Sequence, residues 1–173
     1  MDLESITKKI IKWGEDRNID NPVSQLVKTT EEFGELIEAV DGAKYGNFEK
    51  NRSALIDAIG DTYVTVVIGA NIAGVEYKAP EPIKKDGEVY PEAEYSELEL
   101  IFIAGRIGKI AKCVAHDKMD KVIIKNCIDE ILWSLDTVAG MFNLDLVDCV
   151  AYAYKEISDR KGKTINGNFI KEQ

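Results

Sequence analysis

The chain has 173 residues, of which 31% are charged and 45% hydrophobic, as expected for a single soluble globular domain with a proper core. Its net charge of −9 and its pI of about 4.8 argue against sequence-independent nucleic-acid binding and against adhesion to an anionic membrane. An acidic protein that handles an anionic substrate needs a metal ion as mediator.

The N-terminus and the cysteines indicate a cytoplasmic protein. The first residues, Met1 to Glu4, lack the apolar core of a secretory signal. Cys113, Cys127 and Cys149 are odd in number and lie far apart in apolar segments, so we expect three buried thiols and no zinc or redox site. The single histidine of the chain excludes sites that need two histidines.

Two helices are predicted in the first quarter of the chain. Asp2 can cap a first helix that runs to about Arg17. Asn21 followed by Pro22 is a typical helix start, with a side-chain cap and a proline in the first turn. Gly42 is the expected end of this second helix.

A third helix is predicted after a polar loop over residues 43–52, and it should end at Gly74. From Ala54 onward it is apolar nearly all round and about long enough to span a bilayer. Asp57 and Asp61 argue instead for a helix buried in a bundle, since carboxylates are costly in a membrane.

The centre of the chain is predicted to contain a long loop and a fourth helix. Residues 75–95 have no helical period and hold three of the four prolines, Pro80, Pro82 and Pro91. Ser96 and Glu99 have the spacing of a capping box, which predicts a fourth helix to about Ala115.

Two further helices are predicted before a short tail. Asp120 can cap a fifth helix ending near Gly140, and Asp145 a sixth ending at Gly162. No strand pattern is visible in the tail from residue 163 to 173. The predicted fold is therefore an all-α bundle of about six helices in one domain, residues 1–173.

Two pairs of carboxylates on neighbouring helices are the first candidates for a functional site. Glu32 and Glu35 are three residues apart and Asp57 and Asp61 four, so each pair shares one face of its helix. The second pair stands among apolar residues without a basic neighbour, and an uncompensated carboxylate there is costly. Two facing acidic helices predict an oxygen-ligand site for a hard divalent cation, most simply Mg²⁺.

The sequence contains a weak internal repeat of two helices. At an offset of about 74 residues the second helix aligns with the fourth, and at 72 the third aligns with the fifth. We interpret this as a duplicated hairpin, active over about 22–74 and degenerate over about 96–143, although chance coincidence of amphipathic helices is the simpler alternative. In the second copy Arg106, Lys109 and Lys112 replace Glu32, Glu35 and Glu38, and Trp133, predicted to be buried, replaces Asp61.

Two motifs resemble those of the MazG-like all-α nucleoside triphosphate pyrophosphohydrolases, a superfamily that includes the dimeric dUTPases. The first joins Glu-Glu-x-Gly-Glu-Leu at residues 31–36 to Asp-Ala-Ile-Gly-Asp at 57–61. The second, at residues 153–171, reads Ala-Tyr-Lys-Glu-Ile-Ser-Asp-Arg-Lys-Gly-Lys-Thr-Ile-Asn-Gly-Asn-Phe-Ile-Lys and is similar to phage-type members. The resemblance covers about residues 1–74 and 144–172; the rest resembles an insertion.

The resemblance implies which residues hold the metal. The family pattern Glu-x-x-Glu followed by Glu-x-x-Asp falls on Glu32, Glu35 and Asp61, while its remaining position is Ala58 here. Asp57 is one residue away and is our fourth candidate ligand, although a helical step of about 100° aims it elsewhere.

The implied activity is Mg²⁺-dependent hydrolysis of (deoxy)nucleoside triphosphates between the α- and β-phosphates, with Mn²⁺ as a possible substitute and a homo-oligomer, preferably a dimer, as the expected assembly. Glu31 or Glu38 would orient the attacking water. The alternative is a catalytically impaired nucleotide-binding or scaffold protein of the same fold, because Ala58 replaces a family ligand.

Five residues are candidates for substrate binding, each with a simpler explanation. Arg160, Lys161 and Lys163 can reach phosphates, but basic residues also suit a helix C-terminus. Trp13 can stack on a base or belong to the core. Lys28 can contact phosphate or only pair with the acids one turn away.

Overall fold

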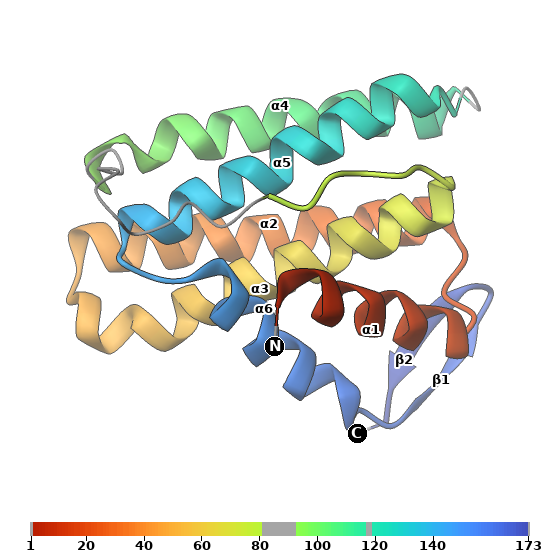
Figure 1. The fold of residues 1–173 in the computed structure, drawn as a ribbon, viewed down its shortest axis with the longest axis horizontal. Helices are drawn as coiled ribbons and strands as arrows, with labels where there is room; N and C mark the ends of the chain where they lie inside the picture. Colours follow the sequence, from red (N-terminus) through yellow and green to blue (C-terminus); the bar gives the residue numbers. More distant parts are fainter. Residues whose placement is uncertain (1, 81–92, 117–118, 173) are drawn as a thin grey trace.

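The computed structural model describes residues 2–80, 93–116 and 119–172, and it confirms the all-α fold (Figure 1). Six helices account for most of the described residues, and a short 3₁₀ turn and a two-stranded hairpin complete them. In chain order the elements are α1 (Leu3–Asp16), α2 (Pro22–Tyr45), α3 (Phe48–Ala73), the 3₁₀ turn (Ala93–Tyr95), α4 (Ser96–Ala115), α5 (Lys121–Met141), α6 (Leu146–Ser158), β1 (Gly162–Ile165) and β2 (Asn168–Lys171).

Two helical hairpins form the core of the bundle. The α2–α3 hairpin packs on the α4–α5 hairpin, with α3 against α5 and α2 against α4, while α1 and α6 cover the other side of α3 (Figure 1). Helix α3 is therefore enclosed by its neighbours. It is the described helix that is long and apolar enough to cross a membrane, and 67% of its most apolar window is buried in the bundle. Its burial agrees with the prediction of a core helix.

Four of the predicted helix starts are confirmed by side-chain caps. The side chains of Asp2, Asn21, Asp120 and Asp145 each accept a hydrogen bond from a backbone N–H in the first turn of the helix that follows. These caps satisfy donors that the helix itself leaves free. The three cysteines are buried and unpaired, also as predicted.

The predicted end of the second helix and the loop after it were wrong. Helix α2 continues past Gly42 to Tyr45, and only Gly46 and Asn47 separate it from α3. The Asn47 side chain accepts a hydrogen bond from the Lys50 N–H at 3.1 Å and so caps α3. An asparagine that begins a helix was the missed signal.

The prediction of a capping box that begins at Ser96 was also wrong. Tyr95 is the N-cap of α4, and the Ser96 hydroxyl donates a hydrogen bond to the Ala93 carbonyl at 2.7 Å. The preceding 3₁₀ turn shifts the helix start by one residue. The predicted loop lies partly outside the described residues, since it includes 81–92; its first part runs past α5, where the Lys78 N–H donates to Asp129 at 2.9 Å.

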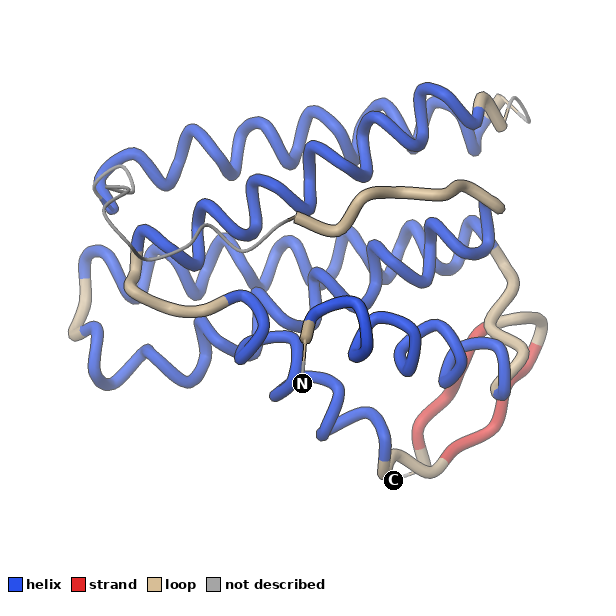
Figure 2. Tube along the Cα trace, in the orientation of Figure 1, coloured by secondary structure: helices blue, strands red, loops and turns tan. Residues whose placement is uncertain are grey.

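The tail is a β-hairpin, which corrects the absence of strands in our prediction (Figure 2). Strands β1 and β2 are antiparallel, and Asn166 and Gly167 form the turn with φ of 53° and 75°. Asn-Gly is the commonest pair for such a turn because both positions need positive φ. The hairpin also ends α6 at Ser158, four residues before the predicted Gly162. It lies against the α1–α2 turn, where the Asn21 amide donates to the Asn166 carbonyl at 3.3 Å.

Trp133 is 57% exposed, so the prediction that it is buried was wrong. The reason is that α1 and α6 cover α3, whereas no described element covers the outer side of α5 in the same way. Arg106, one of the basic residues of the second hairpin, forms an ion pair with Glu130. The duplication itself stays a prediction.

Candidate functional site

A cavity of about 260 Å³ lies where α1, α2, α3, the end of α6 and β2 meet. One part of its wall is polar and another is apolar and aromatic. The polar lining consists of Gln25, Lys28, Glu32, Asp61, Thr65, Arg160 and Lys171, and the apolar lining of Trp13, Ile19, Val64, Ile68, Ile157 and Phe169. The cavity therefore joins Glu32 and Asp61, the acids predicted from two different helices.

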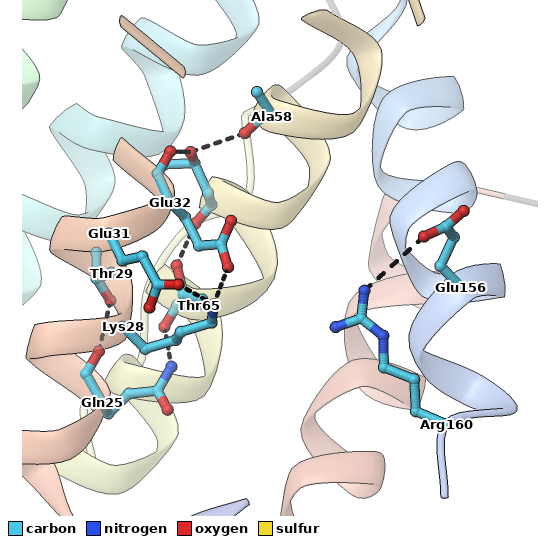
Figure 3. A network of polar contacts seen from close by, with 10 residues as sticks. Gln25, Lys28, Thr29, Glu31, Glu32, Ala58, Thr65, Glu156 and Arg160 are labelled. Atoms are coloured by element: carbon cyan, nitrogen blue, oxygen red, sulfur yellow. Dashed lines mark hydrogen bonds and ion pairs between the residues drawn. The ribbon is translucent and has the colours of Figure 1, made fainter. Parts of the chain in front are cut away.

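Glu32 is a buried carboxylate with one unsatisfied oxygen. It is 4% exposed, and the Lys28 ammonium lies 2.6 Å from its Oε1 and 3.1 Å from Glu31 (Figure 3). Its Oε2 is buried and has no hydrogen-bond partner. Because a buried, unpaired carboxylate oxygen costs free energy, this atom is suited to receive a cation.

Asp61 faces the same cavity from α3 and has an abnormal pKa. Burial raises the pKa of its carboxyl to about 7, and the negative charges of Glu32 and Asp57 add to the rise. Arg160 and Lys28 oppose it without reversing it. Lys28 and Arg160 therefore do not compensate the raised pKa of Asp61.

Asp57 and Glu35 lie beside the cavity, outside its lining. Burial raises the pKa of Asp57, followed by the charge of Glu156 on α6, and its Oδ1 is buried without a partner. The charges that act most on Asp57 thus come from the α6 side, which agrees with its position one helical step from Ala58. Burial and then Glu32 raise the pKa of Glu35, whose side chain is exposed on α2.

The side chains of the four candidate ligands are chemically suited to bind a hard divalent cation. Two carboxylate oxygens, Glu32 Oε2 and Asp57 Oδ1, are buried and unpaired, and all four predicted ligands carry oxygen donors of the kind that Mg²⁺ and Mn²⁺ prefer. Over the described ranges, however, no three His, Cys, Asp or Glu side chains are already grouped as a metal-binding set. The acids are spread along two helices, and the exposed Glu35 would have to turn to join Glu32.

The aromatic end of the cavity is built from α1 and β2. The rings of Trp13 and Phe169 meet edge to face at 5.5 Å, and the Arg17 guanidinium lies 4.4 Å from the Trp13 ring centre. The Nε1 of Trp13 is buried and has no hydrogen-bond partner. A planar ligand with a hydrogen-bond acceptor could satisfy this N–H and contact the rings.

The basic residues near the C-terminus divide between the cavity and the surface. Arg160 lines the cavity and lies 3.8 Å from Glu156 (Figure 3). Lys161 and Lys163 are exposed and outside the lining. Lys163 pairs with Ile170 in the hairpin, so it occupies the opposite face from Lys171. Lys171 lines the cavity instead, and the sequence interpretation missed it.

Other site residues were missed because they need the tertiary fold. Phe169 stands two residues before Lys171 on the same face of β2, which alternation along a strand could have revealed. Gln25 lines the cavity and its amide donates to the Thr65 carbonyl at 2.8 Å, which ties α2 to α3. Of the two predicted water-orienting acids, Glu31 pairs with Lys28, and the exposed Glu38 lies further along α2, outside the lining.

The comparisons with known proteins give one partial likeness. No family model matches the chain, and no solved structure matches it. The chain is 41% identical over 71 residues to an uncharacterized 18.2 kDa protein in the rep-hol intergenic region of Haemophilus phage HP1 (strain HP1c1). The match covers 39% of this chain and 39% of that protein.

Proposed function

We propose that this protein hydrolyses (deoxy)nucleoside triphosphates with Mg²⁺, releasing nucleoside monophosphate and pyrophosphate. The observation that supports this most is the pairing of Glu32 and Asp61, which reach one cavity from two helices, with Lys28 and Arg160 in the same wall. This activity is also the one that the resemblance to MazG-like enzymes implies.

The acids have the role of metal ligands in this proposal. Glu32 and Asp61 would hold the cation from the two helices, and Glu35 and Asp57, which lie outside the cavity lining, would have to reorient to complete the set. Magnesium bound there would supply the positive charge that phosphate oxygens need next to carboxylates and would make water a better nucleophile. The resulting neutralisation would lower the raised pKa of Asp61, since a nearby positive charge favours the ionised carboxylate.

The cations of the wall have the role of phosphate contacts. Lys28 now pairs with Glu31 and Glu32, and Arg160 pairs loosely with Glu156 at 3.8 Å. A triphosphate offers both side chains a more highly charged partner, and the Arg160 guanidinium can bind two of its oxygens at once. Glu31, released from Lys28, would then be able to accept a proton from the attacking water.

In this proposal the aromatic end of the cavity binds the nucleotide base. Trp13 and Phe169 provide ring contacts, and the free Trp13 Nε1 can donate a hydrogen bond to a base. The phosphates would then extend toward Lys28 and Asp61, which line the same cavity.

Product analysis over a nucleotide panel tests this function. Chromatography of the eight common ribo- and deoxyribonucleoside triphosphates after incubation with the protein and Mg²⁺ should show monophosphate and pyrophosphate, and chelator should abolish both. Diphosphate and phosphate as products would refute the proposed bond cleavage. Binding of a nucleotide without turnover would instead favour a non-catalytic nucleotide-binding protein, for which buried Ala58 at a family ligand position is the specific argument.

Replacing Trp13 with leucine should raise the KM for the best nucleotide about tenfold while leaving kcat within about threefold, because stacking on a base contributes roughly 1–3 kcal/mol. Steady-state kinetics measures both constants. The matched control is Tyr45→Leu, which removes an exposed aromatic side chain near the end of α2, away from the cavity lining. An unchanged KM in Trp13→Leu would show that the nucleotide base does not contact Trp13.

A further inference from the structure

Helix α4 exposes a continuous apolar stripe. Leu98, Ile101 and Phe102 are 53%, 65% and 53% exposed, and together with Gly105 they follow the spacing of one helix face. Helix α4 lies at the edge of the bundle (Figure 1). A side chain added at Gly105 would meet no atom within 4 Å, so another backbone can approach closely at this point.

The charges of α4 are separated along its length. Glu99 lies in the first turn, whereas Lys109 and Lys112 lie in the second half. Glu97 and Arg106 already form ion pairs with Lys44 and Glu130 within the chain. A second α4 helix in the same direction would bring like charges together. An antiparallel one would bring acids to bases at both ends, which is the arrangement that a twofold axis near Gly105 produces.

A hollow beside the stripe is suited to a cation. Its volume is about 350 Å³, and Glu99, Phe102, Arg106 and Trp133 contribute to its lining between α4 and α5. The Oε2 of Glu99 is buried and has no hydrogen-bond partner, and the Trp133 and Phe102 side chains are more than half exposed. An ammonium group placed here would satisfy the carboxylate and contact aromatic rings.

We infer that this surface binds a second copy of the chain through antiparallel packing of α4 on α4. With the axis at Gly105, residue 99 of one copy lies opposite residue 111 of the other, so Lys109 and Lys112 reach the Glu99 hollow of the partner copy. The same contact forms twice, once in each direction. In this register Leu98, Ile101 and Phe102 lie opposite residues 112, 109 and 108 of the other copy. They are therefore covered by Gly108 and by the aliphatic stems of Lys109 and Lys112, and burial of this apolar surface is the main driving force.

Charge reversal tests this inference without depending on enzymatic activity. Sedimentation velocity should show a dimer for the wild type. Glu99→Lys alone, or Lys109→Glu with Lys112→Glu, should each raise the dimer dissociation constant about 100-fold, because like charges then face each other at both contacts. An equimolar mixture of the two variants should dimerise again, since each lysine then faces a glutamate.

Two further variants keep the test decisive. Gly105→Glu should also give monomers, because it places two glutamates against each other at the axis, while Val122→Glu, 68% exposed at the start of α5, should remain dimeric. Far-UV circular dichroism checks that each variant is folded. The inference would be overturned by a monomeric wild type or by dimers that charge reversal leaves unaffected. A mixture of the two charge-reversal variants that stays monomeric would overturn it as well and would point to a different partner with a basic helix.

Discussion

Replacing Asp61 with asparagine should reduce pyrophosphate release at least about 100-fold and should also make the metal-free protein more stable above pH 7. The loss of activity follows because an amide cannot replace the anionic oxygen that faces Glu32 across the cavity. The gain in stability follows because the raised pKa of about 7 means that the folded protein disfavours the ionised carboxylate. The amide removes that charge.

The pH dependence of this effect has a definite sign. A carboxyl group with a pKa of 3.8 in the unfolded chain and about 7 in the folded protein is protonated in both states at low pH. As the pH rises from about 4 to 7, the unfolded chain releases its proton first, so stability falls by up to about 4 kcal/mol and is then constant. Asp61→Asn should flatten this fall, which corresponds to a gain of up to roughly 8–16 °C in Tm at pH 8 and little change at pH 4.

Thermal denaturation of chelator-treated protein between pH 4 and 8 measures this effect, and product chromatography measures turnover. The matched control is Asp41→Asn, an exposed acid near the end of the same helix as Glu32, which should change neither result. Full turnover by Asp61→Asn would show that the Asp61 carboxylate is not a metal ligand needed for activity. An unchanged pH profile would mean that its carboxylate is neutralised in the folded protein.

Gly60→Ala should cause the largest loss of stability among small substitutions in α3. A Cβ at Gly60 would lie 2.4 Å from the Cys149 carbonyl oxygen and 2.7 Å from the Ala153 Cβ, so α6 would have to move away from α3. We expect a loss of about 3 kcal/mol, or roughly 10 °C in Tm, because both helices are packed and the nearest atom is backbone. Turnover should fall as well, since Gly60 directly precedes Asp61.

The control for this substitution is Gly34→Ala. Gly34 lies in α2 among the acids, and an added Cβ meets nothing within 4 Å. Alanine there should be neutral or stabilise by up to about 1 kcal/mol, because glycine is a poor helix former. Denaturant titration of both variants measures the difference. A stability equal to that of the wild type in Gly60→Ala would show that α6 packs less closely on α3 than described.

Features set by neighbouring residues could be predicted from the sequence. The caps at Asp2, Asn21, Asp120 and Asp145 depend on side chains within three residues of each helix start, and all four are confirmed. The apolar character of α3 likewise predicted its burial. The false capping box at Ser96 shows the limit of this approach, because a 3₁₀ turn before the helix changed which residue stands at the cap.

Features set by tertiary packing could not be predicted. Glu32 and Asp61 were expected to face each other, but only the fold shows that α1, the end of α6 and β2 close the space around them. Lys171 was overlooked in favour of Lys163 because the hairpin register decides which lysine faces the cavity. The prediction that Trp133 is buried was wrong for a similar reason, since α1 and α6 pack mainly on α3 and leave the outer side of α5 exposed.

Calorimetric titration with Mn²⁺ tests most directly the central claim that acids on α2 and α3 form a divalent metal site. We predict saturable binding to the wild-type protein, the same binding to Asp41→Asn, and loss of binding in both Glu32→Gln and Asp61→Asn, which remove one carboxylate from each helix. Mn²⁺ binding that persists unchanged in both of these variants, or no binding to the wild type, would contradict the account.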